Sequence, residues 1–258
     1  MTGTGFADHF SAAAQRYASA RPVYPPALFE WIAALAPARG QVWEAGCGSG
    51  QATQGLAAVF DAVHATDPSA AQLALVPKLD HVHFAVEPGE RCSLPDASVD
   101  AVCVAQALHW FDRRAFLAEA ARVLKPGGVV VAWGYQDLEV PPVLQEAVGA
   151  FSARIRDAWP AERFLVDRAY IDFKPLFAAA PFDLIDTPPL PVREIVVEWP
   201  LSRMLDYFSS YSAVKRYREA HGVDPVAVHG WAIAAAWGSA PTQRMRWPLF
   251  ALAARRQG

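Results

Sequence analysis

Charge and cysteine are both scarce in this chain, and each scarcity excludes a class of protein. Only 19% of the 258 residues are charged while 53% are hydrophobic, so the composition excludes intrinsic disorder and supplies a large core. The formal net charge of −3 excludes the basic surface typical of nucleic-acid-binding proteins. Three cysteines, Cys47, Cys92 and Cys103, are too few and too widely spaced for a disulfide framework or a zinc site. We therefore expect a globular protein with reduced thiols, no nucleic-acid partner and no metal.

Long apolar runs are also missing. None reaches the roughly 18 residues that a membrane span needs, and residues 1–10 have neither the basic nor the apolar part of a signal peptide. We expect a cytoplasmic protein without a membrane partner. The length fits one large domain or a core with a cap, and the sequence gives no indication of oligomeric state.

Strand-like and helix-like segments alternate through the first half of the chain. The predicted strands are 41–45, 62–66, 81–86, 99–105 and 128–133, and the predicted helices are 51–60, 70–78 and 113–124. This alternation is typical of βαβ units and a parallel sheet. The remainder predicts helices at 7–20 and 26–36, several more helices within 137–240, a strand pair from 182–187 and 194–199, and a closing strand at 244–254. The fold class is therefore α/β, a doubly wound, mostly parallel, Rossmann-like seven-stranded sheet with helical lid insertions.

The most informative motif follows the first predicted strand. Three glycines alternate in Glu44-Ala-Gly46-Cys-Gly48-Ser-Gly50, and the second strand ends at the acidic residue Asp67. In open α/β sheets, ligands bind beyond the carboxyl ends of the strands, where glycines permit a close approach and an acidic residue accepts hydrogen bonds from a ribose. The pattern predicts a nucleoside-containing cofactor.

The spacing of the glycines distinguishes between cofactors. Gln51 stands where a dinucleotide site has its third glycine, and the carboxylate of Glu44 suits an ammonium group better than a pyrophosphate. With Asp67, this motif resembles that of class I S-adenosylmethionine-dependent methyltransferases. The resemblance implies S-adenosylmethionine as cofactor, and as its ligands Glu44, Gly46, Cys47, Gly48, Gly50, Asp67 and Pro68. Two alternatives stay open: an NAD-dependent oxidoreductase, disfavoured by Gln51 and Glu44, and a non-catalytic cofactor-binding protein of the same fold.

The segment 87–100 looks like the adenine-binding turn of this family. An acidic residue usually precedes the x-Leu-Pro of that turn, and Cys92 stands there instead. A thiol is a weak hydrogen-bonding group. The contact with adenine is therefore expected from the backbone of Arg91 or Cys92, or from the side chain of Glu90. Cys92 is also the one feature that favours the non-catalytic alternative.

The loop after the fourth predicted strand is the expected meeting place of substrate and cofactor. It reads Gln106-Ala-Leu-His109-Trp110-Phe-Asp, without the Asn/Asp-Pro-Pro-Tyr/Phe motif of DNA and protein-amide enzymes or the Pro-Cys of cytosine-C5 enzymes. We assign Gln106 to the cofactor, Trp110 to the substrate, and His109 to substrate binding and catalysis. The alternative is that His109 and Trp110 merely begin a capped helix and belong to the core. A carboxylate acceptor needs no base, whereas a hydroxyl or an amine would need His109 to take its proton.

Further motifs resemble the subgroup related to trans-aconitate methyltransferase. They are the residues 10–25, which include Tyr17, Arg21 and Tyr24, and the segments 107–111, 211–225 and 246–249. The resemblance implies a small-molecule acceptor, with Tyr17 and Arg21 at the methionine end of the cofactor and Tyr24 and Tyr135 at the substrate. It also implies a single methyltransferase domain over 1–258, consisting of a helical lid (1–38), a cofactor-binding core (39–135), a substrate cap with the remaining core elements (136–240) and a closing strand (241–258).

Overall fold

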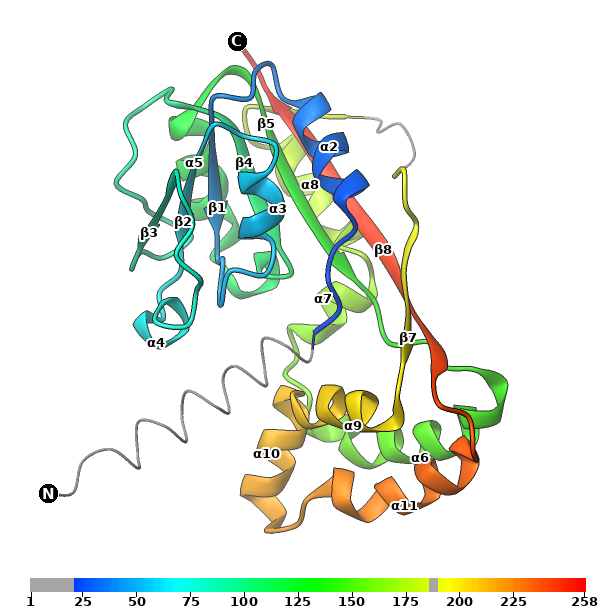
Figure 1. Ribbon diagram of the computed structural model, residues 1–258. Coiled ribbons are helices and arrows are strands. Elements are labelled where there is room, and N and C mark those ends of the chain that lie inside the picture. Colours follow the sequence, from blue (N-terminus) through cyan, green and yellow to red (C-terminus); the bar gives the residue numbers. More distant parts are fainter. Residues whose placement is uncertain (1–20, 186–189) are drawn as a thin grey trace, which may run out of the picture. The chain divides into compact units, whose positions relative to one another are not determined.

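The computed structural model describes residues 21–185 and 190–258 (Figure 1). Two compact units make up the chain. The core unit comprises Val23–Gln136, Phe164–Arg193 and Pro248–Gly258, and the helical unit comprises Met1–Pro22, Asp137–Arg163 and Glu194–Trp247. The helix predicted at 7–20, and with it Tyr17, lies outside the described residues.

An eight-stranded sheet runs in the order β3-β2-β1-β4-β5-β8-β6, and β7 pairs with β8 beside this path. Its strands are β1 (Gln41–Ala45), β2 (Ala62–Thr66), β3 (Val82–Ala85), β4 (Val99–Ala105), β5 (Leu124–Tyr135), β6 (Phe182–Leu184), β7 (Glu194–Trp199) and β8 (Gln243–Arg256). The first five are parallel, β8 is antiparallel to β5, and β6 is antiparallel to β8. The strand order reverses between β1 and β4, which is the switch point where open α/β sheets bind ligands.

Three strand predictions need correction. The sheet has eight strands rather than seven, because β7 adds to β8 outside the main path. The expected pair of late strands does not form, since β6 and β7 each pair with β8 instead. The strand predicted from residue 128 begins at Leu124, which pairs with Val99 before the register shifts and resumes at Ala101 and Val129. The Pro-Gly-Gly turn is thus an irregularity within β5, with Gly127 at a φ of 76°.

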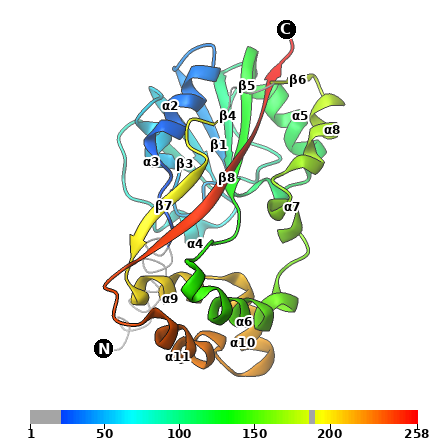
Figure 2. The ribbon, with the colours of Figure 1, turned by 90° about the vertical axis from the view of Figure 1, so that its right-hand side faces the viewer.

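Helices cover both faces of the sheet in the core unit, as Figure 2 shows for α2 and α3 on one side and α5 and α8 on the other. The helices of this unit are α2 (Pro26–Leu35), α3 (Thr53–Ala57), α4 (Ala70–Leu73), α5 (Arg113–Val123) and α8 (Lys174–Ala178). A further helix, α7 (Arg163–Asp167), has its first residue in the helical unit and the others in the core unit. The predicted helices 51–60 and 70–78 are both shorter than expected. Pro77 disfavours helical backbone at the residue before it, so a helix could not reach residue 78, and α4 already ends at Leu73.

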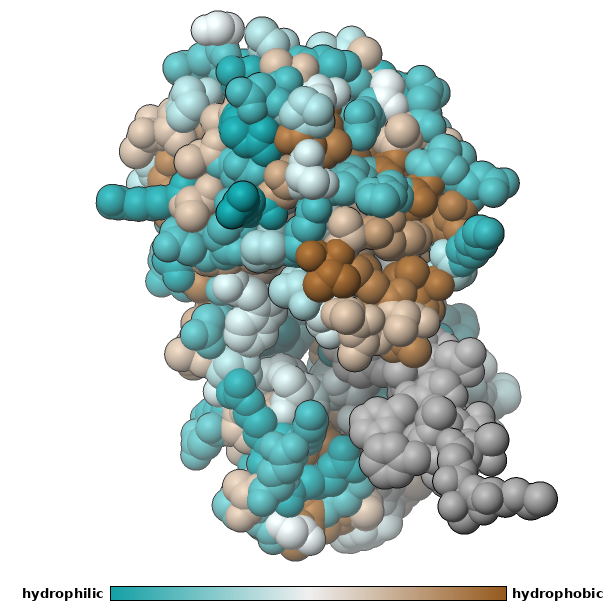
Figure 3. Space-filling view, turned by 90° about the vertical axis from the view of Figure 1, so that its left-hand side faces the viewer, coloured by the Kyte–Doolittle hydropathy of each residue, from teal (hydrophilic) through white to brown (hydrophobic). Residues whose placement is uncertain are grey.

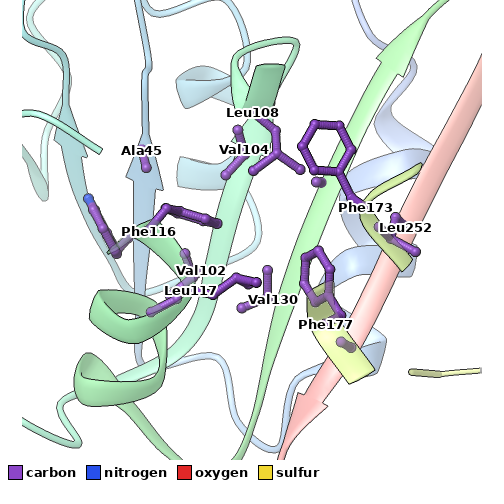
Figure 4. Packing of buried hydrophobic residues seen from close by; sticks show 14 of the residues in the cluster. Ala45, Val102, Val104, Leu108, Phe116, Leu117, Val130, Phe173, Phe177 and Leu252 are labelled. Carbon is purple, nitrogen blue, oxygen red and sulfur yellow. The ribbon is translucent and has the colours of Figure 1, made fainter. Parts of the chain in front are cut away.

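One face of the sheet carries a continuous apolar cluster. Alternate strand residues such as Trp43, Val102 and Val130 point to this face, where they meet Phe116 of α5 and Phe177 of α8 (Figure 4). Successive side chains of a strand point to opposite faces, so Glu44 points away from this cluster. Its neighbourhood on the other face is covered by α2 and α3.

The helical unit consists mainly of α6 (Gln145–Ile155), α9 (Leu201–Ser209), α10 (Ser212–His221) and α11 (Pro225–Trp237). Its core is aromatic: the indole N–H of Trp247 donates to the hydroxyl of Tyr207 at 2.9 Å, and Trp199 packs edge-on against both rings. Among the described residues, no helix combines the length and the apolar character needed to cross a membrane. On the face that Figure 3 shows, strongly hydrophobic surface gathers in one part of the core unit, while hydrophilic surface covers much of the rest.

Candidate functional site

The glycine loop begins where β1 ends. The backbone N–H groups of Gly46 and Cys47 both donate to the carbonyl oxygen of Thr66, at 2.8 and 2.9 Å, which ties the loop to the tip of β2. Gly46 has a φ of 70°, and a Cβ there would lie 2.7 Å from the Cβ of Ala107. Glycine is therefore required by backbone conformation and by contact with the loop after β4. The cofactor and substrate loops predicted from the sequence are direct neighbours.

Asp67 braces the same loop. Its Oδ2 accepts a hydrogen bond from the Gly48 N–H at 2.9 Å, and its Oδ1 accepts one from the Ser69 N–H at 2.8 Å. The residue is buried, at 7% exposure, and Pro68 beside it is exposed. A carboxylate has about four lone-pair sites, so these two bonds leave capacity for a ligand hydroxyl. Asp67 thus has a structural task that the sequence did not indicate, and it keeps the chemistry expected of a ribose ligand.

Glu44 is fully buried on β1 with one oxygen unsatisfied. The hydroxyl of Thr53, in α3, donates to Oε2 at 2.6 Å, whereas Oε1 has no hydrogen-bond partner among the described residues. Burial raises the pKa of the Glu44 carboxyl to about 8, opposed by the Thr53 hydrogen bond and assisted by the negative charge of Asp67. A buried polar atom without a partner is rare in native proteins. A cation placed at Oε1 would satisfy it and favour the ionised carboxylate.

The turn predicted to hold adenine is fixed by contacts that the sequence did not reveal. The Cys92 N–H donates to Glu119 at 2.8 Å, and Arg122 binds both Glu119 and the Cys92 carbonyl. Burial raises the pKa of the Cys92 thiol to about 12, so the thiol stays protonated. The Glu90 carboxylate accepts from the Asp112 N–H at 2.7 Å, and Arg91 is exposed. The Cys92 amide and the Glu90 carboxylate therefore both serve the protein's own structure.

Gln106, at the tip of β4, has a positive φ of 56°. Its amide nitrogen donates to the Tyr135 carbonyl at 3.0 Å, and its amide oxygen accepts from the Tyr135 N–H at 2.9 Å. The side chain thereby extends the hydrogen bonding between β4 and β5 by one rung. The sequence did not indicate this bracing role, and the cofactor contact predicted for Gln106 stays a prediction.

His109 lies in a short 3-10 turn (Leu108–Trp110) and is buried, at 8% exposure. Its Nδ1 lies 3.0 Å from the hydroxyl of Tyr170, a fully buried residue 61 positions later in the chain. The neighbouring Trp110 is 55% exposed, with its ring centroid 4.7 Å from that of His109. The structure thus separates the two residues that the sequence treated together: His109 is anchored, whereas Trp110 presents its ring to the surface.

Tyr24 and Tyr135, both expected at the substrate, are buried in an aromatic cluster of the core unit. The Tyr24 ring lies 6.0 Å from that of Trp133 and 5.9 Å from that of Tyr135, measured between centroids.

The indole nitrogen of Trp133, like Oε1 of Glu44, is buried and has no hydrogen-bond partner among the described residues.

Comparison with known proteins decides the family. A family model described as a methyltransferase domain matches residues 43–132. A Dictyostelium discoideum protein named as a methyltransferase is 31% identical over 230 residues, which are 86% of this chain and 84% of that protein. This chain belongs to the class I S-adenosylmethionine-dependent methyltransferases.

Two further relatives agree with this assignment. A solved structure titled as a type II methyltransferase from Anaeromyxobacter dehalogenans has a TM-score of 0.80 at 41% identity, and the match covers 91% of this chain and 97% of that one. A Mycobacterium tuberculosis methyltransferase is 36% identical over 152 residues, or 57% of this chain and 62% of that protein. The methyltransferase assignment removes the oxidoreductase and the non-catalytic protein as alternatives.

The residues at the strand tips fit S-adenosylmethionine, the cofactor of this methyltransferase. The unpartnered Oε1 of Glu44 suits the ammonium group of the methionine part, and the remaining lone pairs of Asp67 suit a ribose diol. The raised pKa of Glu44 supports the fit, because a buried carboxyl kept neutral for want of a cation would ionise beside one.

Arg21 belongs to the helical unit, whereas the glycine loop belongs to the core unit. Its guanidinium lies 5.7 Å from the centroid of the Tyr207 ring and donates to the Ser210 carbonyl at 3.5 Å. The same unit contains a groove of about 870 Å³ that the sequence did not indicate. Trp159, Phe208 and Tyr211 are among the residues that line it.

Proposed function

We propose that this methyltransferase acts on a small-molecule acceptor, at a carboxylate or a hydroxyl oxygen. The observation that carries the proposal is the contact between the glycine loop and the loop of His109, where a Cβ on Gly46 would meet Ala107 at 2.7 Å. An acceptor held by His109 would therefore lie beside the loop that binds the cofactor. The net charge of −3 also favours a small acceptor over a nucleic acid.

S-adenosylmethionine supplies a methyl group already activated by its sulfonium, so the protein contributes alignment and exclusion of water. Glu44 holds the ammonium group, Asp67 holds the ribose, and the glycine backbone lets both parts approach. Gly48, Gly50, Cys47 and Pro68 complete the predicted cofactor contacts, with the backbone at Arg91 for adenine. His109 and the exposed ring of Trp110 hold the acceptor, together with Tyr24 and Tyr135.

The finer proposal is a relationship to trans-aconitate methyltransferase. It rests on the lid motif containing Tyr17, Arg21 and Tyr24, and on the segments 107–111, 211–225 and 246–249. Within this proposal, small carboxylic acids are the first acceptors to test.

The test is a methyl-transfer assay over a panel of small carboxylic acids, trans-aconitate among them, and of hydroxy compounds without a carboxyl. Mass spectrometry distinguishes methyl esters from methyl ethers. We expect product from at least one acceptor with the natural protein and far less with Asp67→Ala at limiting cofactor. Binding of S-adenosylmethionine by calorimetry, without product from any member of the panel, would contradict a small acid or alcohol as acceptor.

A further inference from the structure

The carboxyl group of Glu44 has one oxygen engaged and one left over. The Thr53 hydroxyl donates to Oε2 at 2.6 Å, and Oε1 has no hydrogen-bond partner among the described residues. Both residues are fully buried. Thr53 is the first residue of α3, a few positions after Gly50, so the helix that follows the glycine loop determines that one oxygen is held and the other stays available.

The titratable groups around Glu44 supply negative charge or none. Asp67, at the tip of β2, acts on the carboxyl as a nearby negative charge. Burial raises the pKa of the Cys47 thiol, in the glycine loop, and that of the Cys103 thiol, on β4, well above the ordinary range. Both thiols therefore stay neutral near pH 7 and do not titrate together with Glu44.

The two helices over this face do not compensate for the burial of Glu44. α3 has no charged residue, and the one charge of α2, Glu30, is exposed and lies 3.2 Å from the guanidinium of Arg39. Within the described part of the chain, the Thr53 hydroxyl is the one hydrogen-bond donor to this carboxyl.

These surroundings favour the neutral form of Glu44 in the cofactor-free protein. Removal from water penalises a charged carboxylate, and a neighbouring negative charge adds to that penalty. Burial accordingly raises the pKa of Glu44 to about 8, although the Thr53 hydrogen bond opposes the rise. Near pH 6.5, Glu44 therefore carries a proton until a cation arrives at Oε1.

We propose that Thr53 is a positioning residue that engages Oε2 of Glu44 and leaves Oε1 to the ammonium group of S-adenosylmethionine, which takes the place of a proton, so that cofactor binding releases one proton from the protein. This inference rests on the cofactor contact proposed for Glu44, and it adds a proton exchange and a role for Thr53. The O–H bond of the carboxyl breaks, its electron pair stays on the oxygen, and the proton passes to the solvent. The ammonium group keeps its own protons and donates a hydrogen bond to the carboxylate.

The exchange makes cofactor affinity depend on pH in a defined direction. Below the pKa of Glu44, binding releases a proton, so the affinity rises by about tenfold for each pH unit. The amino group of the cofactor stays protonated until the pH approaches the ordinary α-amino value of about 7.7–8.0. Measurements between pH 5.5 and 7.0 therefore report on the protein rather than on the ligand.

The first test counts the protons and needs no methyl acceptor. Calorimetry of S-adenosylmethionine binding at pH 6.5, in two buffers of different ionisation enthalpy, gives the number of protons released. We expect about one proton for the natural chain and none for Glu44→Gln, whose affinity should not change between pH 5.5 and 7.0. The natural chain should bind more tightly than Glu44→Gln at pH 7.0, and the difference should narrow as the pH falls.

The outcomes separate this inference from the contact on which it rests. If the natural chain releases no proton and its affinity is independent of pH, while Glu44→Gln binds more weakly, the proton exchange is wrong and the contact stands. If Glu44→Gln binds as the natural chain does at every pH, Glu44 does not hold the ammonium group, and the proposed contact fails together with the inference. The proposed acceptor is not at stake in either case, because only the methyl-transfer panel tests it.

The second test concerns Thr53. Thr53→Val keeps the shape of the side chain and removes the donor, so the carboxylate formed on binding loses a hydrogen bond. We expect the affinity for S-adenosylmethionine at pH 6.5 to fall roughly ten- to a hundredfold, with one proton still released, and Thr53→Ser to restore most of the loss. Thr53→Ala provides the same comparison with Thr53→Ser if Thr53→Val does not fold.

A purely structural role for Thr53 predicts a different pattern. In the Glu44→Gln background, the same substitution at Thr53 should cost much less affinity, because no carboxylate is formed there. An equal loss in both backgrounds, or a Thr53→Ser variant that is as weak as Thr53→Val, overturns the positioning role. Unchanged affinity in Thr53→Val overturns it as well.

Discussion

The two faces of the sheet in the core unit differ in whether they contain buried polar atoms that have no hydrogen-bond partner. The face that carries Trp43 and Val102 packs against Phe116 and Phe177 as an uninterrupted apolar cluster. The opposite face contains Glu44 and Trp133, each with a buried polar atom that has no partner among the described residues. Apolar packing completes the first face without a ligand. The second face carries a free-energy penalty in the protein alone, which a suitable ligand would remove.

The largest effect should come from breaking the apolar face. Phe177→Ala removes a fully buried ring and should lower the free energy of unfolding by about 3–5 kcal/mol. Chemical denaturation measures this loss. Calorimetry on the folded protein should show an unchanged affinity for S-adenosylmethionine, because Phe177 lies on the face away from Glu44. A loss of affinity that exceeded the unfolded fraction would show that the two faces are not independent.

The second prediction concerns the pH dependence that Glu44 confers on the cofactor-free protein. Its pKa is about 8 in the folded state, against the ordinary value of 4.5, so the folded protein binds more protons than the unfolded chain between these two pH values. Stability from this group is full below the lower value and declines as pH rises toward 8. Between pH 5.5 and 7.5, the contribution of Glu44 should fall by about 2–3 kcal/mol, at about 1.4 kcal/mol per unit.

Glu44→Gln is the control for that prediction, because the amide has nearly the same shape and does not titrate in this range. Denaturation curves at several pH values, recorded for both proteins, isolate the contribution of Glu44 by difference. Equal slopes in the two proteins would show that Glu44 ionises normally in the fold, and the contrast between the two faces would lose its electrostatic basis.

Asp67 offers a smaller effect on the ligand-binding face. Asp67→Ala removes a charged acceptor from the predicted ribose contact, and hydrogen bonds to charged groups contribute about 1.5–3 kcal/mol. Affinity for S-adenosylmethionine should therefore fall roughly ten- to a hundredfold, as measured by calorimetry. Because Asp67 also braces the backbone at Gly48 and Ser69, Ser69→Pro is an informative companion: it keeps the carboxylate but removes the N–H bonded to Oδ1, together with the hydroxyl that caps α4. If both variants lost affinity equally, loop bracing rather than ribose binding would explain the role of Asp67.

The parts of the structure that depend on local pattern could be predicted from the sequence. The bounds of β1, β2, β4 and β7 match the prediction, because each is a short segment rich in apolar and β-branched residues that ends at a turn or polar residue. The placement of the glycine loop after β1 and of Asp67 after β2 was predicted for the same reason. Shorter elements were less well predicted: α4 spans four residues where nine were expected, since helical propensity continued past the point that packing supports.

The contacts within the candidate site could not be predicted, because they join residues far apart in the chain. Tyr170 lies in no recognisable motif, and only the fold brings it to His109. The hydrogen bonds between the Gln106 side chain and the Tyr135 backbone were likewise not predicted, because they depend on how β4 and β5 are aligned. The hydrogen bond between Thr53 and Glu44 joins residues only nine positions apart in the chain. It could not be predicted either, because it depends on where α3 places the Thr53 hydroxyl.

Phe111 connects three loops mechanically. Its ring would meet a Cβ at Gly46 at 3.0 Å and a Cβ at Gly89 at 2.7 Å, and it belongs to the loop that carries His109. The glycine loop, the predicted adenine turn and the loop of His109 thus pack against one another through a single ring, so a shift of one loop presses on the other two. We therefore expect that a ligand which displaces this ring at one predicted site changes the affinity at the other, and by thermodynamic linkage the effect would be reciprocal. The expected kinetic signature is an order of binding, with the cofactor first, which initial-rate measurements over both substrates would reveal.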